Sequence, residues 1–222
     1  RAIESVKDHV RNIYAIDGKF EFYESSDLLS TPDVRNYLRS IDNVVLVDVP
    51  NRKENEKRQT YLDYCEKNLA DWLLILDADE YITDETNWDS VYADLLKNTT
   101  EAKAPAIFGV TIKPYGDSKK EFGYPRLWRA PYLIRYLKTH NFWEFKTTGK
   151  IYRSSITWPA IKGIFMKGSD ELRDKKYLDK SYAYQLKLMK YEKPFKDVYR
   201  QKAENTKPSN VDPRLPPGFP VM

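Results

Sequence analysis

The fold of this chain is constrained most by an alternation in residues 1–83, where helical patterns are followed three times by short runs of consecutive apolar residues. The apolar runs lie at residues 12–18, 43–50 and 71–80. A strand can be apolar at successive positions only where both faces of its sheet are covered, which is typical of parallel sheets. The pattern therefore predicts the α/β class, with a doubly wound and mostly parallel sheet that carries helices on both faces.

Each run follows a segment whose apolar residues have helical spacing. The first helix is expected at residues 1–10, and the second begins with Thr31 as its cap and Pro32 at its first position. The third is expected at residues 54–70. Its apolar face consists of Tyr61, Leu62, Cys65 and Leu69.

The second half of the chain has a different character, because aromatic and β-branched residues are interrupted there by Gly and Pro. This is typical of strands and loops, and it predicts an antiparallel extension of the sheet. We expect residues 1–168 to form one domain in two halves, 1–83 and 84–168. A C-terminal helix at 169–194 and a Pro-rich tail at 195–222 follow, since proline is excluded from helix interiors.

The composition bounds the class of protein. Apolar residues make up 41% and charged residues 32% of the 222 residues, which argues against disorder and favours a packed core. The formal net charge of +4 is small, so no nucleic-acid partner is expected. Cys65 is the single cysteine, which excludes an intrachain disulfide and favours a reducing, cytoplasmic location. No apolar run approaches the roughly 18 residues of a membrane span.

The expected C-terminal helix has two interpretations. It places Leu178, Tyr182, Leu186 and Met189 on one stripe, with many lysines opposite. The favoured interpretation packs this stripe against the domain and leaves a solvated basic face. The alternative lays the helix on an anionic membrane surface, which would make the protein peripheral at the inner face of a membrane.

Carboxylates follow the most apolar strand of the chain. Asp77, Asp79 and Glu80 come directly after the run at residues 72–76. In an open parallel sheet, ligands bind beyond the carboxyl ends of the strands. Two carboxylates one residue apart repel each other unless a cation lies between them, and hard ions such as Mg²⁺ and Mn²⁺ use one or two carboxylates together with substrate phosphates. An Asp-x-Asp pair also ends many strands and caps many helices without binding anything.

Three segments resemble the glycosyltransferase family 2 domains of the GT-A fold. The stretch EKRQTYLDYCEKNLADWLLILDADEYIT resembles the core of the family, and RAIESVKDHVRNIYAIDG and YPRLWRAPYLIRYLKTHNFWE resemble its earlier and later segments. The resemblance covers residues 1–150. It implies a nucleotide-binding half at 1–83 and an acceptor half at 84–168. It also implies a nucleotide-sugar donor, with a uridine diphosphate sugar as the default, a bound Mn²⁺ or Mg²⁺, and transfer with inversion to an acceptor that the sequence does not identify.

The resemblance assigns roles residue by residue. Asp17 is expected to hold the base or ribose, Asp77 to face the ribose or metal, and Asp79 to ligate the metal. Arg58 and Arg126 either approach the donor or pair with carboxylates. His140 is a candidate third metal ligand. Inversion also requires a general base that takes the proton of the acceptor. The candidates for this base are Glu144, Asp170 and Glu171.

Two other functions remain open. A sugar nucleotidyltransferase would use the same carboxylates, although no Gly-rich phosphate loop is visible. A non-catalytic module of the same fold would bind a sugar or nucleotide without transferring it. The aromatic residues that favour this module are Trp128, Trp143 and Trp158.

Overall fold

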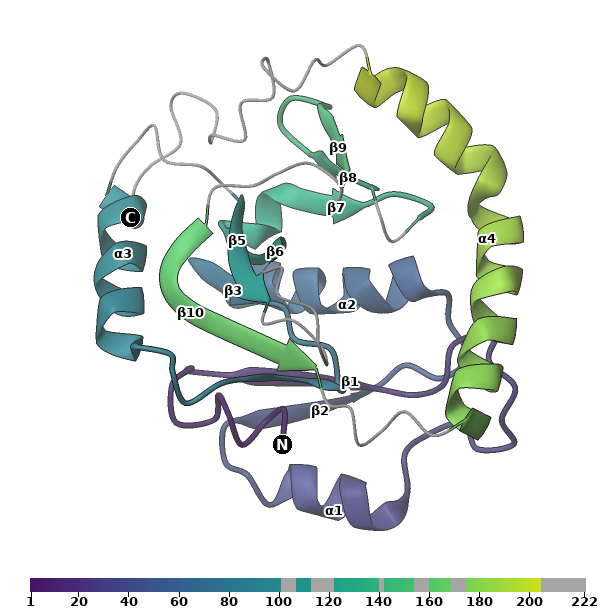
Figure 1. Ribbon diagram of the computed structural model, residues 1–222, viewed down its shortest axis with the longest axis horizontal. Coiled ribbons are helices and arrows are strands. Elements are labelled where there is room, and N and C mark those ends of the chain that lie inside the picture. The colour runs from purple at the N-terminus through teal and green to yellow at the C-terminus, as the bar shows by residue number, and fades with distance from the viewer. Residues whose placement is uncertain (101–106, 113–121, 140–141, 154–159, 169–174, 205–222) are drawn as a thin grey trace.

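The computed structural model describes residues 1–100, 107–112, 122–139, 142–153, 160–168 and 175–204 (Figure 1). Its elements in chain order are β1 (Ile13–Asp17), α1 (Pro32–Arg39), β2 (Val44–Asp48), α2 (Glu54–Lys67), β3 (Trp72–Leu74), β4 (Glu80–Ile82), α3 (Trp88–Thr100), β5 (Ile107–Ile112), β6 (Phe122–Arg129), the short 3₁₀ helix η1 (Pro131–Leu133), β7 (Ile134–Tyr136), β8 (Phe142–Phe145), β9 (Ile151–Arg153), β10 (Ala160–Gly168) and α4 (Lys175–Glu204). The mixture of helices with parallel and antiparallel strands confirms the α/β class.

The strands form three sheets. The strands β1 and β2 pair in parallel as a sheet of their own, and β7, β8 and β9 form an antiparallel sheet. The central sheet has the order β3-β6-β5-β10-β4, in which only β5 and β10 run parallel. The expectation of a mostly parallel sheet is therefore wrong for the described strands, because β3 pairs with the returning strand β6 instead of continuing the β1–β2 sheet. The expected antiparallel extension is present.

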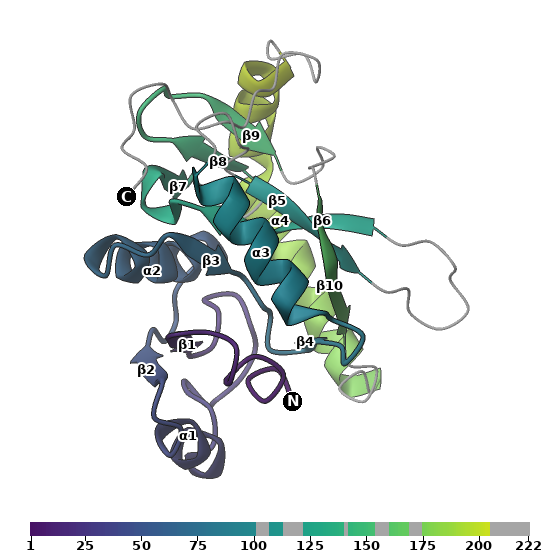
Figure 2. The same ribbon diagram turned by 90° about the vertical axis from the view of Figure 1, so that its left-hand side faces the viewer.

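The central sheet is covered on both faces (Figure 2). Leu127 and Trp128, neighbours in β6, point to opposite faces, as the two-residue period of a strand requires. Leu127 packs with Val91 of α3 and with Val6 of the N-terminal turns. Trp128 packs with Leu62 of α2 and with the β7–β9 sheet. The prediction of helices on both faces is thus confirmed for this sheet.

The unit formed by β1, α1 and β2 is less buried than its sequence suggests. Its helix begins as predicted, with Pro32 in the first turn after Thr31. None of the residues of α1 is fully buried, and Val45 of β2 is exposed. The two strands are apolar at successive positions, although most of their residues are only partly buried.

Residues 1–10 form turns instead of the expected helix. The backbone N–H groups of Ser5 and Lys7 donate four residues back, but those of Val6 and His9 donate three residues back, so a continuous α-helical bond pattern is not formed. The Ser5 hydroxyl accepts a hydrogen bond from the backbone of Ile82 at 3.0 Å. Since isolated helices of about ten residues are marginal in water, this tertiary contact and the burial of Val6 decide the local conformation.

The last helix continues beyond the expected boundary at residue 194. Pro194 lies inside α4, and residues 195–204 are helical, which corrects the expected start of the tail. A proline inside a helix costs about 3 kcal/mol. Aromatic packing on both sides of it offsets this cost, since the ring of Phe195 contacts Tyr191 and the ring of Tyr199 contacts Phe142. Residues 205–222 lie outside the described part of the chain, and the division of the chain at residue 168 stays a prediction.

The inner face of α4 is also not the expected one. Tyr184, Leu188 and Glu192 are buried, whereas Tyr182, Leu186 and Met189 are exposed to solvent. The prediction that this stripe packs against the domain is therefore wrong for these three residues. The side chain of Leu178 lies outside the described residues. No helix in the described ranges combines the length and the apolar character that crossing a membrane requires.

Candidate functional site

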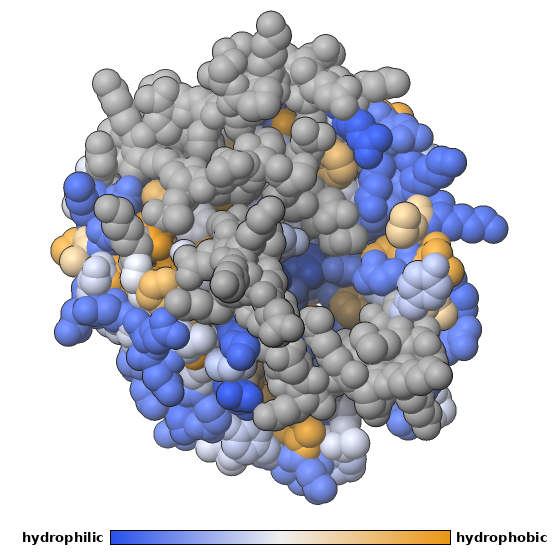
Figure 3. All heavy atoms as spheres, viewed as in Figure 1, coloured by the Kyte–Doolittle hydropathy of each residue, from blue (hydrophilic) through white to orange (hydrophobic). Residues whose placement is uncertain are grey.

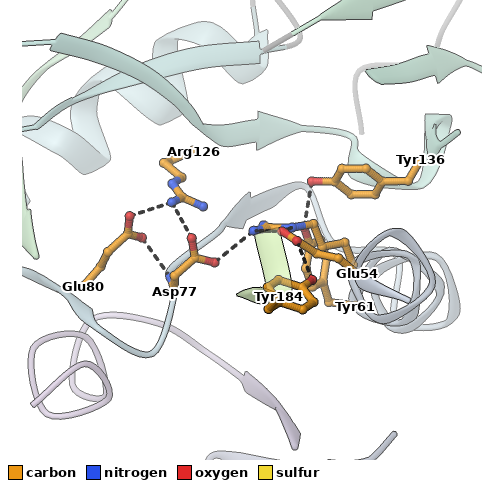
Figure 4. Close-up of polar contacts among 8 residues, drawn as sticks. Glu54, Tyr61, Asp77, Glu80, Arg126, Tyr136 and Tyr184 are labelled. Atoms are coloured by element: carbon orange, nitrogen blue, oxygen red, sulfur yellow. Dashed lines mark hydrogen bonds and ion pairs between the residues drawn. The ribbon is translucent and has the colours of Figure 1, made fainter. Parts of the chain in front are cut away.

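Asp77 lies at the centre of a partly buried cluster of charges beyond the carboxyl end of β3 (Figure 4). One carboxylate oxygen of Asp77 accepts a hydrogen bond from Nη2 of Arg126 at 2.7 Å, and the other lies 3.3 Å from Nη2 of Arg58. The same Nη2 of Arg126 donates to Glu80 at 2.6 Å. The backbone N–H of Asp77 donates to Glu80 at 2.9 Å, which closes the group.

The pairing of β3 with β6 positions Arg126 in this cluster. Leu74 pairs with Leu127, and the N–H of Ile75 donates to the carbonyl of Arg126 at 2.7 Å, so Arg126 lies across from the residues that lead to Asp77. The Arg126 side chain is buried. Among the described residues, its Nε–H has no hydrogen-bond acceptor. A buried donor without an acceptor destabilises the fold, so such groups are rare. The Nε–H of Arg126 is therefore suited to bind an anion.

One face of α2 supplies the second side of the cluster. Glu54, Lys57, Arg58 and Tyr61 have the i, i+3, i+4 and i+7 spacing of neighbours on a helix. Glu54 accepts from Arg58 at 3.0 and 3.1 Å and from the hydroxyl of Tyr184 in α4 at 3.0 Å. The hydroxyls of Tyr61 and Tyr136 are 2.7 Å apart. The helices α2 and α4 and the strand β7 therefore meet at this site.

The cluster perturbs the acid–base properties of its carboxylates in opposite directions. Burial would raise the pKa of Asp77, but the guanidinium groups of Arg58 and Arg126 outweigh burial and lower this pKa to about 2. Burial raises the pKa of Glu80, helped by the nearby charge of Asp77 and opposed by Arg126. Asp77 is thus a fixed anion at neutral pH. Glu80 takes up a proton more readily than Asp77 does.

Asp17 forms a second polar group, at the carboxyl end of β1. It accepts hydrogen bonds from the backbone N–H of Ser30 at 3.1 Å and from the Ser30 hydroxyl at 2.7 Å, and it pairs with Arg35. Burial opposes ionisation of Asp17, but Ser30 and Arg35 outweigh it and lower the pKa of Asp17. Arg35 also pairs with Asp48, which lies opposite Asp17 in the parallel register of β1 and β2.

Lys57 lies between the two polar groups. Its ammonium donates to the carbonyl of Gly18, directly after Asp17, and lies 4.4 Å from the centre of the Phe20 ring. Burial lowers the pKa of Lys57 to about 8, although the charges of Asp17 and Glu54 oppose this shift. A buried lysine with a lowered pKa is typical of ligand-binding and catalytic sites. The structure thus brings the Lys57 cation close to Asp17, and the cations at Asp77 are those of Arg58 and Arg126.

The site offers hard oxygen ligands for a divalent cation, but not a complete set. Asp79 lies in the turn after Asp77, and among the described residues no side chain or backbone group is paired with its carboxylate. No three His, Cys, Asp or Glu side chains in the described ranges are grouped as a metal site. One paired carboxylate and one carboxylate two residues later could hold Mg²⁺ or Mn²⁺ only if substrate phosphates complete the shell. His140, the predicted third ligand, lies outside the described residues.

The predicted general bases are not drawn into the cluster by any described contact. Glu144 in β8 accepts from Nη2 of Arg135 at 2.8 Å, and the two residues are cross-strand partners in the β7–β8 pair. This ion pair gives Glu144 a role in holding the small sheet. Asp170 and Glu171 lie outside the described residues. The assignment of the base among these three stays a prediction.

Trp128 and Trp143 do not offer surfaces on which a sugar could stack. Both indoles are almost fully buried, and their ring centres are 5.2 Å apart within the core between α2 and the β7–β9 sheet. The sequence argument that these rings favour a sugar-binding module is therefore wrong for these two residues. Trp158 lies outside the described residues.

The sequence alone assigned no role to several residues of the site. Glu80 belongs to the quoted Asp-Ala-Asp-Glu stretch, and the polar i, i+3, i+4 spacing on α2 could have identified Glu54 and Lys57. The parts played by Tyr136 and Tyr184 carry no local signal, because Tyr184 is 130 residues from its partner Glu54.

Comparison with protein-family models and with curated proteins found no match for this chain. The similarity to the glycosyltransferases consequently rests on the sequence segments described above.

Proposed function

We propose that this protein is a glycosyltransferase that binds a nucleotide-diphosphate sugar beyond the carboxyl ends of β1 and β3 and transfers the sugar to an acceptor with inversion. The observation that carries the proposal is the partly buried Asp77 cluster, in which the buried Arg126 keeps a donor that no described residue accepts, while the carboxylate of Asp79, two residues after Asp77, has no partner among the described residues. Fixed cations in a site of low dielectric constant stabilise the charge that develops on a departing diphosphate.

The diphosphate binds by exchange of partners. A phosphate oxygen has the charge and geometry to replace the Asp77 carboxylate on the guanidinium of Arg126 or Arg58. Asp79 and Asp77 would hold a Mg²⁺ or Mn²⁺ ion, which when bound neutralises the diphosphate and stabilises it as a leaving group. The arginines remain paired with an anion throughout the exchange, and the cation would offset the negative charge that the diphosphate brings.

The nucleoside half of the donor extends toward β1. Asp17 ends this strand and accepts hydrogen bonds from Ser30 and Arg35, and a ribose hydroxyl or a base N–H would offer donors of the same kind. The Lys57 ammonium donates to the carbonyl of Gly18, the next residue. Uridine diphosphate sugars are the first donors to test. Inversion in one step requires the base to be on the acceptor side, for which Glu144, Asp170 and Glu171 are the candidates.

The test is calorimetric titration with uridine diphosphate, with Mn²⁺ present and after chelation, of the wild-type chain and of Asp79→Asn. The matched control is Asp84→Asn, which removes an exposed carboxylate from the following loop. We expect metal-dependent binding that Asp79→Asn weakens at least roughly tenfold and that Asp84→Asn leaves unchanged. Equal binding by both variants, or no nucleotide binding, would refute the proposed donor site.

Transfer is distinguished from binding and from nucleotidyl transfer by its products. Incubation with a uridine diphosphate sugar should release uridine diphosphate at a rate that an acceptor increases. Incubation with uridine triphosphate and a sugar 1-phosphate should release no pyrophosphate. Pyrophosphate release would instead identify a sugar nucleotidyltransferase, and tight binding without either product would identify a binding module.

A further inference from the structure

We propose that the outer face of α4 docks on the surface of an anionic lipid bilayer. The surface concerned, called here the α4 stripe, consists of Tyr182, Leu186 and Met189. The inference is independent of the proposed catalytic function, because none of these residues takes part in the Asp77 cluster.

The α4 stripe is apolar and has no cover from the described parts of the chain. Its side chains are 67%, 49% and 57% exposed in the order Tyr182, Leu186 and Met189. Their i, i+4 and i+7 spacing places them on one side of the helix. Figure 3 shows apolar atoms among hydrophilic ones over α4, toward the right-hand edge of that view. A contiguous exposed apolar surface of this kind is typical of an interaction site.

Packing on the opposite side fixes the direction of the stripe. Tyr184 donates to Glu54 of α2, its ring stacks on Phe20, and Leu188 is buried. These contacts hold α4 in a defined rotation, so the stripe cannot turn inward without breaking them. The rigid domain therefore presents the stripe to solvent as a preformed surface.

The charge around the stripe identifies the partner. Lys190 and Lys193 are exposed, and the helical period places Lys193 between Leu186 and Met189 in angle. Lys187 is also exposed but pairs with Glu24 at 2.6 Å. The acidic Glu192 is buried and pairs with Lys196, so it does not face the stripe. The exposed Asp197 lies on the stripe side one turn after Lys193, and the exposed Arg200 on the same side offsets its charge. Lysines whose stems flank apolar side chains match the interface of an anionic membrane, where the charges meet lipid phosphates and the apolar groups enter the acyl boundary.

The test is sedimentation of the full chain with vesicles of phosphatidylcholine alone and of equimolar phosphatidylcholine and phosphatidylglycerol. We expect binding to the anionic vesicles only, weakened as salt is raised to physiological ionic strength. The double variant Leu186→Gln/Met189→Gln should bind at least about tenfold more weakly, because burial of a large apolar side chain contributes more than a tenfold change in affinity. The control Val198→Gln, an equally exposed apolar residue nine positions after Met189 and so on about the opposite side of the helix, should bind as the wild type does.

A second variant keeps the test independent of apolar packing. Lys190→Gln/Lys193→Gln changes only exposed charges, and it should reduce the binding and its salt dependence while the thermal unfolding curve stays unchanged. Three results would overturn the proposal. They are no binding to anionic vesicles, equal binding by the wild type and the stripe variant, and a wild-type dimer that the stripe variant converts to monomer, which would identify a second copy of the chain as the partner.

Discussion

Replacing Arg126 with methionine tests the buried charge cluster directly. Arg126 is 5% exposed, and its Nη2 lies 2.6 Å from Glu80 and 2.7 Å from Asp77. Methionine keeps an apolar stem but leaves both carboxylates without this cation. Removing one partner of a buried ion pair costs about 3–5 kcal/mol. Solvent access to the Asp77 side chain, which is 39% exposed, reduces the expected loss to about 3 kcal/mol.

Urea denaturation and thermal unfolding measure this loss. For a chain of this size, 1 kcal/mol corresponds to about 2–4 °C in Tm, so Arg126→Met should lower Tm by roughly 6–12 °C.

Glu80→Gln removes one of the two carboxylates, while the amide oxygen still accepts from the Asp77 N–H. In the double variant we expect about 1–2 kcal/mol less destabilisation than the sum of the two single changes, since the residues are in contact.

The matched control is Arg135→Met, which breaks a similar ion pair with Glu144 at the surface. The Arg135 side chain is 55% exposed, and an exposed pair contributes about 0–1 kcal/mol. A loss for Arg126→Met as small as that of the control, or strict additivity with Glu80→Gln, would refute the reasoning that the cluster is desolvated and coupled.

Three further predictions concern the same part of the molecule. Asp77 has its pKa lowered from 3.8 to about 2, so its ion pairs stabilise the fold fully above pH 3.8 and lose this contribution as pH falls toward 2. The contribution is about 1 kcal/mol after allowance for solvent screening. Urea denaturation at several pH values in this range should show that the unfolding free energy changes less with pH for Asp77→Asn than for the wild type. Gly18→Ala should destabilise the fold by at least about 2 kcal/mol, because Gly18 has φ +130° and a Cβ there would lie 2.7 Å from the Val49 carbonyl oxygen; an unchanged urea midpoint would contradict this. Tyr184→Phe should cost about 1–2 kcal/mol in unfolding free energy, since it removes a hydrogen bond to Glu54, and loss of this cost in a Glu54→Leu background, which has no acceptor, would show that the bond is responsible.

Local sequence signals predicted the elements better than their assembly. The apolar runs became β1, β2 and β3, and Thr31 and Pro32 marked the start of α1, because these signals act within a few residues. Whether β3 continues the β1–β2 sheet or pairs with β6 depends on contacts more than 50 residues apart. Periodicity in one segment contains no information on such a choice.

The orientation of α4 shows a second limit. The helix has apolar residues on both sides, with Tyr184 and Leu188 on one and Tyr182 and Leu186 on the other. Periodicity alone gives both sides a similar weight, and the hydrogen bond of Tyr184 to Glu54 selects between them. The site was predictable in part. The sequence identified Asp77 and gave pairing with carboxylates as one of two roles for Arg58 and Arg126. The tyrosines that border the cluster were found only from the fold.

The place of β10 in the central sheet has a consequence for synthesis on the ribosome. The strand β4 ends at Ile82, but its described sheet partner is β10, which begins at Ala160. At about 5–20 residues per second, the ribosome needs roughly 4–16 s to make the chain between them. During this interval β4 and the inner face of α3 have no β10 to cover them. The nascent chain therefore exposes an apolar surface for seconds, which is long enough for a chaperone to bind it, and the core closes only after about three-quarters of the chain has been made.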